Sequence, residues 1–404
     1  MNEVKLELYS ESLESLKKSY FTINSEICDL SPSSKLDILE NDSIFLEIGS
    51  NRIIFKFANL DLSLSNGAVF QEQNENMKLF ILKSNFKVKL ENLEDSIDYL
   101  LENGKSLLCR RCNFSIMSIE EFNFEKIPFI TDDSRTMSSS ETFFCECNPS
   151  NNAKTRIPTE QKTKSSSDCC KTEKSILKFN SIQLILSHEM IQKCAVFQNN
   201  CIIYCKHCLS PLGSQNLDKD VILLNNRIFF SLSGEDDSTQ GLLSESAFIS
   251  DYEFLYQLCR NFITNNIHRF ILFCSTLETV YPFALVWLLD QRVLLHHQLV
   301  EESFPPDQEI NVNVDSIYIE RILYRILTRQ NDSIIDMDSK SLMDDWMKDL
   351  SVEQIILPME TCIAFCSILT QISQKISPKN RYENSDSRKG FIVGGIPINK
   401  FQCS

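Results

Sequence analysis

Apolar and polar residues alternate along much of the first hundred residues, with the period of two typical of a β-strand that has one buried face. Residues 4–8 show this pattern, since Val and Leu alternate there with charged side chains. Residues 44–57 predict a β-hairpin, and residues 78–90 predict two further short strands. We therefore expect a β-rich lobe over residues 1–104.

The alternation stops at residues 132–174, where Ser, Thr, Asn and Lys predominate and aliphatic side chains are almost absent. Such a stretch cannot bury enough apolar surface to offset the conformational entropy that ordering removes. We expect a mobile insertion there, inside a middle region that covers residues 105–215.

Helix and strand patterns are mixed over residues 216–404. The clearest helix is predicted at residues 250–266, where Ser250 and Glu253 have the spacing of a capping box. A second helix is predicted to begin at Pro358, because proline is favoured in the first helical turn. Strands are predicted at residues 221–232, 268–274, 283–289, 352–357 and 391–393, and residues 315–327 fit either element. This irregular mixture, without a repeated βαβ unit, predicts an α+β fold.

The composition of the chain argues against several classes of function. The chain has 404 residues, 43% of them hydrophobic, with a net charge of −15 and only 9 glycines. The hydrophobic share suffices for a sizeable core, and the low glycine count argues against glycine-rich nucleotide-binding loops. The acidic balance argues against a general nucleic-acid binder, although it leaves room for a local basic patch.

No export or membrane segment is recognisable in the pattern. Residues 1–18 lack the apolar stretch of a signal peptide, and the longest apolar run, residues 283–289, is far shorter than the ~20 residues that cross a bilayer. We expect no membrane association and a cytoplasmic location, and a nuclear location stays open as well.

Two Cys-x-x-Cys pairs stand out among the 16 cysteines: Cys109 with Cys112, and Cys205 with Cys208. Each pair places two thiolates on one tight turn, and two such turns complete a tetrahedral four-cysteine zinc site. The pairs are far apart in sequence, but the entropy of closing a loop grows only logarithmically with its length. We predict one structural Zn²⁺ shared by all four cysteines, with two unrelated turns or a redox pair as alternatives. Basic side chains that favour thiolates lie between the two cysteines of each pair: Arg110, Arg111, Lys206 and His207.

The other cysteines give weaker indications. Cys145 and Cys147, inside the predicted insertion, are reserve zinc ligands, and Cys169 and Cys170 are further candidates; free thiols are the alternative for all four. Five cysteines lie among apolar residues and are expected to be small buried side chains: Cys28, Cys194, Cys259, Cys274 and Cys366.

Several motifs follow one another in a characteristic order. The early pair at residues 109–112 is followed by Cys-Lys-x-Cys-x-x-x-Leu-Gly at residues 205–213, and later by an apolar segment that ends Trp-Leu-Leu at residues 287–289. From about Leu107 to the carboxyl end, this order resembles the HECT-like ubiquitin ligases that bind a ubiquitin-conjugating enzyme (E2). One motif of the family is incomplete in this chain: residues 143–149 contain two cysteines but lack the family's Trp and His.

The resemblance implies a ubiquitin-protein ligase that binds an E2 and promotes ubiquitin transfer to protein lysines. A HECT-type ligase carries ubiquitin as a thioester on its own cysteine, which requires an exposed and activated thiolate. Cys362, early in the helix after Pro358, is a weak candidate, and a buried structural cysteine is the preferred interpretation because core-periodic residues surround it. Packing is likewise the preferred role of His296 and His297.

Two other functional classes stay open. One is a non-catalytic, zinc-stapled client-binding protein or chaperone, for which the resemblance suggests the pre-mRNA cleavage and polyadenylation endonuclease as client. The other is a zinc-ribbon nucleic-acid factor, which the acidic balance disfavours.

The expected partners follow from the resemblance: an E2, ubiquitin and a protein substrate, without direct nucleic-acid binding. E2 enzymes present a basic first helix as a common docking face. The acidic segment 234–250 is therefore a candidate docking loop, although an ordinary solvated linker is the preferred interpretation.

Overall fold

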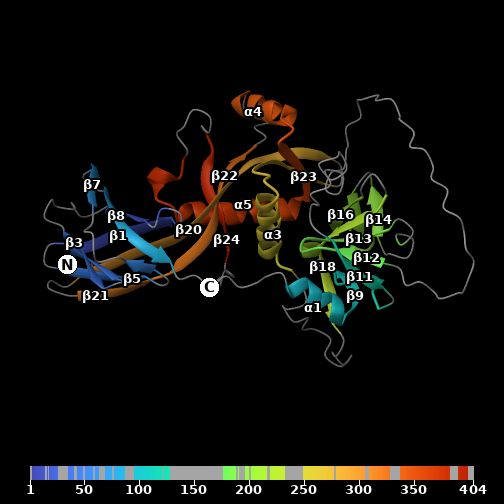
Figure 1. Ribbon diagram of the computed structural model, residues 1–404, viewed down its shortest axis with the longest axis horizontal. Helices are drawn as coiled ribbons and strands as arrows, with labels where there is room; N and C mark the ends of the chain where they lie inside the picture. Colours follow the sequence, from blue (N-terminus) through green and yellow to red (C-terminus); the bar gives the residue numbers. More distant parts are fainter. Residues whose placement is uncertain are drawn as a thin grey trace, which may run out of the picture.

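In the computed structural model, strands from both ends of the chain pair in a single ten-stranded sheet (Figure 1). Its longest member is β20, a strand of 25 residues that pairs with β19 along its first part, with β1 along its last part, and with β22. The sheet comprises β1 (Asn2–Leu13), β2 (Lys18–Ser25), β6 (Leu60–Leu62), β7 (Val69–Asn74), β8 (Met77–Phe86), β19 (Arg269–Ser275), β20 (Val280–Phe304), β22 (Ser316–Ile326), β23 (Val352–Pro358) and β24 (Ile392–Pro397).

The structure describes the following residues: 2–13, 16, 18–25, 35–40, 43–48, 51–57, 60–62, 69–74, 77–86, 95–120, 122–127, 176–187, 190, 196–199, 202–215, 219–232, 249–276, 279–304, 309–327, 337–382 and 390–398. The predicted mobile insertion at residues 132–174 lies outside them.

A four-stranded sheet packs beside the N-terminal part of the large sheet. Aromatic rings join the two sheets, since Phe57 lies 5.4 Å from Phe21 and 5.0 Å from His296 between ring centroids. His296 is fully buried there, which agrees with the packing role expected for it. The small sheet comprises β3 (Lys35–Glu40), β4 (Ser43–Ile48), β5 (Asn51–Phe57) and β21 (Glu309–Val314).

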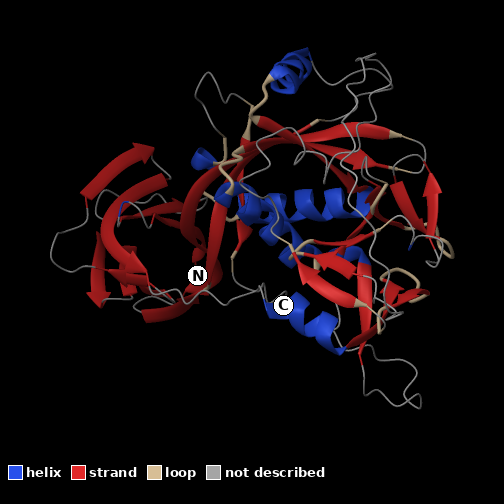
Figure 2. Ribbon diagram, turned by 45° about the vertical axis from the view of Figure 1, so that its right-hand side comes forward, coloured by secondary structure: helices blue, strands red, loops and turns tan. Residues whose placement is uncertain are grey.

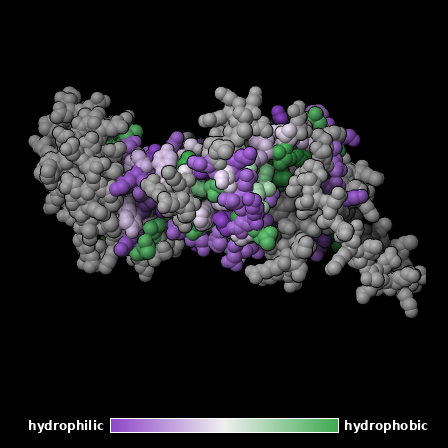
Figure 3. All heavy atoms as spheres, turned by 90° about the horizontal axis from the view of Figure 1, so that it is seen from above, coloured by the Kyte–Doolittle hydropathy of each residue, from purple (hydrophilic) through white to green (hydrophobic). Residues whose placement is uncertain are grey.

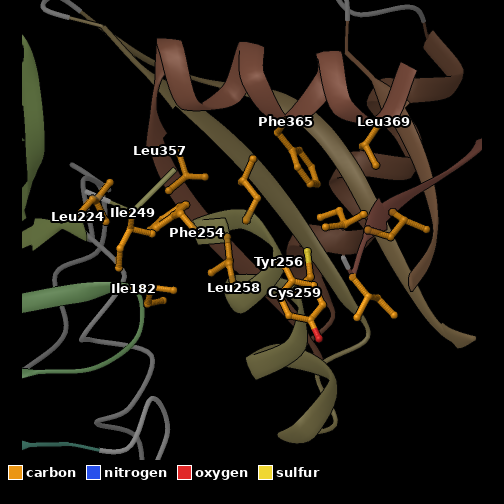
Figure 4. Packing of buried hydrophobic residues seen from close by; sticks show 14 of the residues in the cluster. Ile182, Leu224, Ile249, Phe254, Tyr256, Leu258, Cys259, Leu357, Phe365 and Leu369 are labelled. Atoms are coloured by element: carbon orange, nitrogen blue, oxygen red, sulfur yellow. The ribbon is translucent and has the colours of Figure 1, made fainter. Parts of the chain in front are cut away.

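Two helices, α3 (Asp251–Thr264) and α5 (Met359–Gln374), pack against each other and on the C-terminal part of the large sheet, and the strands curve around them (Figure 2). The Phe270 ring on β19 packs against one ring from each helix, with centroid distances of 5.4 Å to Phe262 and 6.4 Å to Phe365. Figure 4 shows Phe254, Leu258 and Cys259 of α3 in the same cluster as Phe365 and Leu369 of α5. Burial of these side chains is the main energy that holds the helices in place.

The middle of the chain forms two smaller sheets, both at the right of Figure 1. The three-stranded sheet comprises β9 (Gly104–Cys109), β10 (Ser115–Ser118) and β18 (Ile228–Leu232). The seven-stranded sheet comprises β11 (Asn123–Lys126), β12 (Ile176–Phe179), β13 (Gln183–Leu186), β14 (Val196–Asn199), β15 (Ile202–Cys205), β16 (Pro211–Gln215) and β17 (Val221–Leu224).

The α+β class and most of the predicted elements are confirmed. The hairpin is β4 with β5, whose strands pair in antiparallel register from Ile48 opposite Asn51. The predicted capping of α3 is also present, because the Ser250 hydroxyl accepts a hydrogen bond from the Glu253 N–H at 3.1 Å. The ambiguous residues 315–327 form strand β22.

Two element predictions were wrong. Residues 78–86 lie in one continuous strand, β8, which runs through the turn predicted at residues 84–85, and residues 87–90 lie outside the described residues. Residues 221–232 form two strands in different sheets, joined by the 3₁₀ turn η5 (Asn225–Arg227). The strand predicted at residues 283–289 is confirmed, and it is part of the longer β20, which continues beyond a register shift between Leu288 and Arg292.

Two helices lacked a clear signal in the sequence: α1 (Asp95–Asn103) and α4 (Met337–Lys348). Among the described residues no helix is long and apolar enough to cross a bilayer. On the face shown in Figure 3, the described residues are largely hydrophilic, with separate hydrophobic patches.

The domain boundaries at residues 104 and 215 stay a prediction. The strand pairing of β1 with β20 nevertheless joins the first predicted domain to the last in one sheet.

Candidate metal centre

The first Cys-x-x-Cys pair lies on the turn between β9 and β10. The Cys109 N–H donates to the Phe114 carbonyl at 2.9 Å, and the Asn113 N–H donates to the Cys109 carbonyl at 2.8 Å. Asn113 has a left-handed φ of 57°, which asparagine tolerates better than most residues. This closed turn directs the thiols of Cys109 and Cys112 to the same side.

The second pair repeats this geometry between β15 and β16. The Cys205 N–H donates to the Ser210 carbonyl at 2.9 Å, and the Leu209 N–H donates to the Cys205 carbonyl at 2.9 Å. Leu209 has a φ of 56°, at the position that Asn113 occupies in the first turn. The two turns, here called the knuckles (residues 109–114 and 205–210), therefore share one backbone conformation.

The knuckles bring the four predicted zinc ligands together. The Sγ atoms of Cys109 and Cys208 lie 3.6 Å apart, those of Cys112 and Cys205 lie 3.7 Å apart, and all four lie within 4.8 Å of one another. A tetrahedral ion with metal–sulfur bonds of about 2.3 Å requires sulfur atoms about 3.8 Å apart. The four sulfurs therefore fit one closed metal site, with every coordination position supplied by the protein.

The surroundings act on the thiols of this cluster in different directions. Burial raises the pKa of Cys109 and Cys112 above the ordinary thiol value. Burial acts in the same direction on Cys208, but a hydrogen bond from the Ser210 backbone and the neighbouring thiols outweigh it and lower its pKa. A metal ion bound at this site would favour the thiolate form of all four cysteines, because its positive charge compensates their negative charge.

The site joins two sheets, because one knuckle extends from the three-stranded sheet and the other from the seven-stranded sheet. Next to it the chain itself crosses between the sheets at η5. Gly213, the glycine of the family-like element, allows β16 to approach β17 closely, since a Cβ atom there would lie 1.8 Å from the Ile222 carbonyl oxygen. This is a packing requirement, and it holds the second knuckle at its place on the sheet.

Arg227 of η5 connects the second knuckle to helix α5. Its guanidinium donates to the Pro211 carbonyl at 3.2 Å and to the Ser210 hydroxyl at 2.9 Å, and it lies 3.5 Å from the Glu360 carboxylate. The Arg227 carbonyl also accepts from the N–H of Arg110 in the first knuckle at 3.1 Å. A single buried arginine thus contacts both knuckles and the first turn of α5.

Asn226, the residue before it, connects the same region to both helices. Its amide group donates to the Asp251 carboxylate of α3 at 2.6 Å and to the Thr361 hydroxyl of α5 at 3.1 Å. Arg110 completes the link, 2.8 Å from the Asn226 carbonyl and 3.2 Å from Asp251. Asp251 lies in the first turn of its helix, where the helix dipole stabilises a carboxylate.

Sequence reasoning missed Asn226 and Arg227 as residues that support the site. Their only signal was a polar Asn-Asn-Arg run inside an otherwise apolar stretch. That run marked the point at which the predicted single strand divides into β17 and β18.

Cys362, the weak nucleophile candidate, lies in the core. Its side chain is fully buried, and its Sγ atom is 3.6 Å from the Leu357 carbonyl and 3.8 Å from the Phe273 carbonyl. Burial raises its pKa well above the ordinary thiol value. In this structure the thiol has neither the exposure nor the lowered pKa that a thioester-forming nucleophile needs.

The remaining candidate residues are placed as follows. The reserve ligands Cys145 and Cys147, the pair Cys169 and Cys170, and most of the acidic docking segment 234–250 lie outside the described residues. Cys259 and Cys274 are buried as expected, and Cys366 is partly buried. His297 packs against Tyr9 with ring centroids 4.9 Å apart.

Comparison with known families decides the classification of this arrangement. Residues 55–386 match the family described as HECT-like ubiquitin-conjugating enzyme (E2)-binding. The chain belongs to this family. No curated protein and no solved structure matches the chain.

The family match begins within β5, earlier than the resemblance noted from the sequence motifs, and it spans both knuckles and the two central helices. Strand β24 lies beyond its end. The E2-binding family region therefore includes the metal centre and the structures attached to it through η5.

Proposed function

We propose that this chain is a ubiquitin-protein ligase that binds an E2 and promotes the transfer of ubiquitin to lysines of a protein substrate. Its membership in the HECT-like E2-binding family over residues 55–386 is the observation that carries the proposal. An E2 that holds ubiquitin as a thioester already contains the activated acyl group, so a ligase can act by positioning it.

The described cysteines favour direct transfer from the E2 over a thioester on the ligase itself. Cys259, Cys274 and Cys362 are buried, Cys366 is partly buried, and the other four described cysteines form the metal cluster. Burial also raises the pKa of Cys366 to about 12, so its thiol is protonated near neutral pH. A hydrogen bond with Cys362 lowers the pKa of Cys274 to about 7, but this thiol is buried, and Cys208, whose pKa is also lowered, belongs to the metal cluster. None of the eight described cysteines is therefore both exposed and free to act as a thiolate nucleophile.

We further propose that the metal is Zn²⁺ and that its role is structural. Cys109, Cys112, Cys205 and Cys208 would hold it, and a closed site of four thiolates is typical of structural zinc. When bound, the ion supplies folding energy by joining the two sheets and leaves no open position for catalysis.

The decisive experiment is a single-turnover assay with an E2 that has been charged with ubiquitin, analysed without reducing agent. The full-length chain should accelerate discharge of the E2 onto lysine, and no reducible ubiquitin adduct should form on the chain. The variants Cys362→Ala and Cys259→Ala, which each remove one buried thiol, should retain the activity of the wild type equally.

Other results would contradict the proposal in different ways. A thioester adduct that disappears only in Cys362→Ala would indicate HECT-like transfer through that cysteine. E2 binding without faster discharge would favour the client-binding alternative, with the pre-mRNA cleavage endonuclease as the first client to test.

A further inference from the structure

The basic residues beside the metal cysteines divide into two groups with different surroundings. Arg110 is used internally, because it contacts the Asn226 carbonyl and Asp251. Arg111, Lys206 and His207 are exposed. The Arg111 side chain retains 64% of its surface and has one weak ion pair, 4.0 Å from an exposed Glu360. Arg111 and Lys206 form a local cationic patch, with the His207 ring beside it, on a chain that is acidic overall.

A stacked pair of rings lies within this patch. Phe114 of the first knuckle and His207 of the second are 5.0 Å apart between centroids, with only 9° between their planes. Phe114 is still 40% exposed although one face of its ring is covered. The metal site holds both knuckles together, so the two rings form a rigid, solvent-facing stack.

Leu209 adds an exposed apolar side chain in an unfavourable backbone conformation. It is 46% exposed, and its φ of 56° lies in the left-handed region that is costly for leucine. Asparagine occupies the matching position of the other knuckle, so the fold does not require leucine there. Strain of this kind, combined with exposure, is characteristic of residues kept for an interaction.

We infer that the knuckle tips (Arg111, Phe114, Lys206, His207 and Leu209) bind single-stranded nucleic acid. A base would extend the stack on Phe114, and Arg111 and Lys206 would contact the flanking phosphates, the arrangement by which many proteins hold unpaired strands. The flat, nearly parallel rings favour a base over an acidic protein segment, because carboxylate side chains have no ring to continue the stack.

The acidic net charge limits the strength of this binding without excluding it. The net charge sets long-range repulsion, whereas phosphate contacts depend on the few cations at the site. Two phosphate contacts predict a shallow slope of about −1.4 for log affinity against log salt concentration. The inference is independent of the ligase activity, which needs no nucleic acid.

The test uses the full-length, zinc-loaded chain and a fluorescein-labelled oligouridylate of about twelve nucleotides, titrated by fluorescence anisotropy at low salt. Phe114→Ala should weaken binding about fivefold or more, because it removes one stacked base. Lys206→Ala should weaken binding and reduce the salt slope by about 0.7, since it removes one phosphate contact.

Matched controls exist on β12 of the seven-stranded sheet, which β13 and β17 separate from β16. Ile176 is 53% exposed and Lys178 is exposed, so Ile176→Ala and Lys178→Ala remove the same kinds of group away from the knuckles. Both controls should bind like the wild type.

Three results would overturn the inference. The first is absence of oligouridylate binding at low salt. The second is equal affinity of Phe114→Ala and Ile176→Ala. The third is displacement of the oligonucleotide by a polyglutamate of equal charge at equal concentration, which would assign the patch to acidic protein segments.

Discussion

The described residues contain two sulfur clusters that differ in backbone geometry, number of sulfur atoms and surroundings. The metal cluster lies on two turns that extend from different sheets, with Sγ atoms 3.6–3.7 Å apart across the site. The core cluster consists of Cys274, Cys362 and Met359, where the Cys274 thiol lies 3.5 Å from the Met359 sulfur between β19 and α5. Both clusters contain sulfur atoms at similar distances, yet only the first has four ligands around one point.

The backbone explains the difference. A knuckle closes on itself through two hydrogen bonds and directs two thiols to one side, whereas Cys274 and Cys362 lie in a strand and a helix, where core packing determines their directions. The buried thiol of Cys362 is also directed at backbone carbonyls, which stabilise its protonated form. Closely spaced cysteines therefore indicate a metal site only where the local backbone directs their thiols toward one point.

The largest expected effect comes from removing one ligand of the metal cluster. Cys205→Ser should release the metal and destabilise the chain by several kcal/mol, because metal binding in a structural site contributes folding energy. Cys274→Ser in the core cluster should keep the metal and cost about 1–2 kcal/mol. Metal analysis and thermal unfolding measure both effects, and the wild type should contain one zinc per chain. A wild-type chain that is fully folded without metal would contradict a structural role for the four-cysteine cluster.

The link between the metal centre and the core predicts an intermediate effect. Arg227→Ala leaves the Pro211 carbonyl and the Ser210 hydroxyl without their buried donor, so we expect a loss of about 2–4 kcal/mol. Arg111→Ala is the matched control, because Arg111 pairs with the same Glu360 in an exposed position and should cost less than about 1 kcal/mol. Urea denaturation gives both values. Equal losses in the two variants would show that η5 does not connect the regions as described.

The smallest expected effect is a difference in pH dependence between the clusters. Burial raises the pKa of Cys366, beside the core cluster, to about 12. The unfolded thiol ionises at about pH 8.5, so above that pH the unfolded chain binds fewer protons than the folded chain. Stability should then fall as pH rises, by at most about 1.4 kcal/mol per pH unit for this thiol. The metal cluster responds in the opposite direction, since acid protonates thiolates and releases the ion.

The measurement is the free energy of unfolding from neutral pH to about pH 10 for the wild type and Cys366→Ala. The free energy of unfolding of the variant should decline less steeply above about pH 8.5, because the variant lacks the Cys366 thiol. Parallel curves for the two proteins would remove Cys366 as a source of the alkaline decline.

The sequence alone was enough to predict the features that depend on interactions between residues close together in the chain. The capping box at Ser250 and the apolar spacing after it predicted α3, and the short spacing within each Cys-x-x-Cys pair predicted two metal-binding turns. The order of the cysteine, glycine and tryptophan motifs indicated the family that the chain belongs to. Each of these features depends on residues that are close neighbours in the chain.

Tertiary structure decided the features that depend on distant residues. The pairing of β1 with β20, the division of residues 221–232 between two sheets, and the burial of Cys362 follow from long-range packing. The four basic residues beside the cysteines look alike in sequence, but the fold turns Arg110 toward Asp251 and leaves Arg111 in solvent. A side chain's environment is set by the elements that pack around it, and the local sequence alone does not contain those elements.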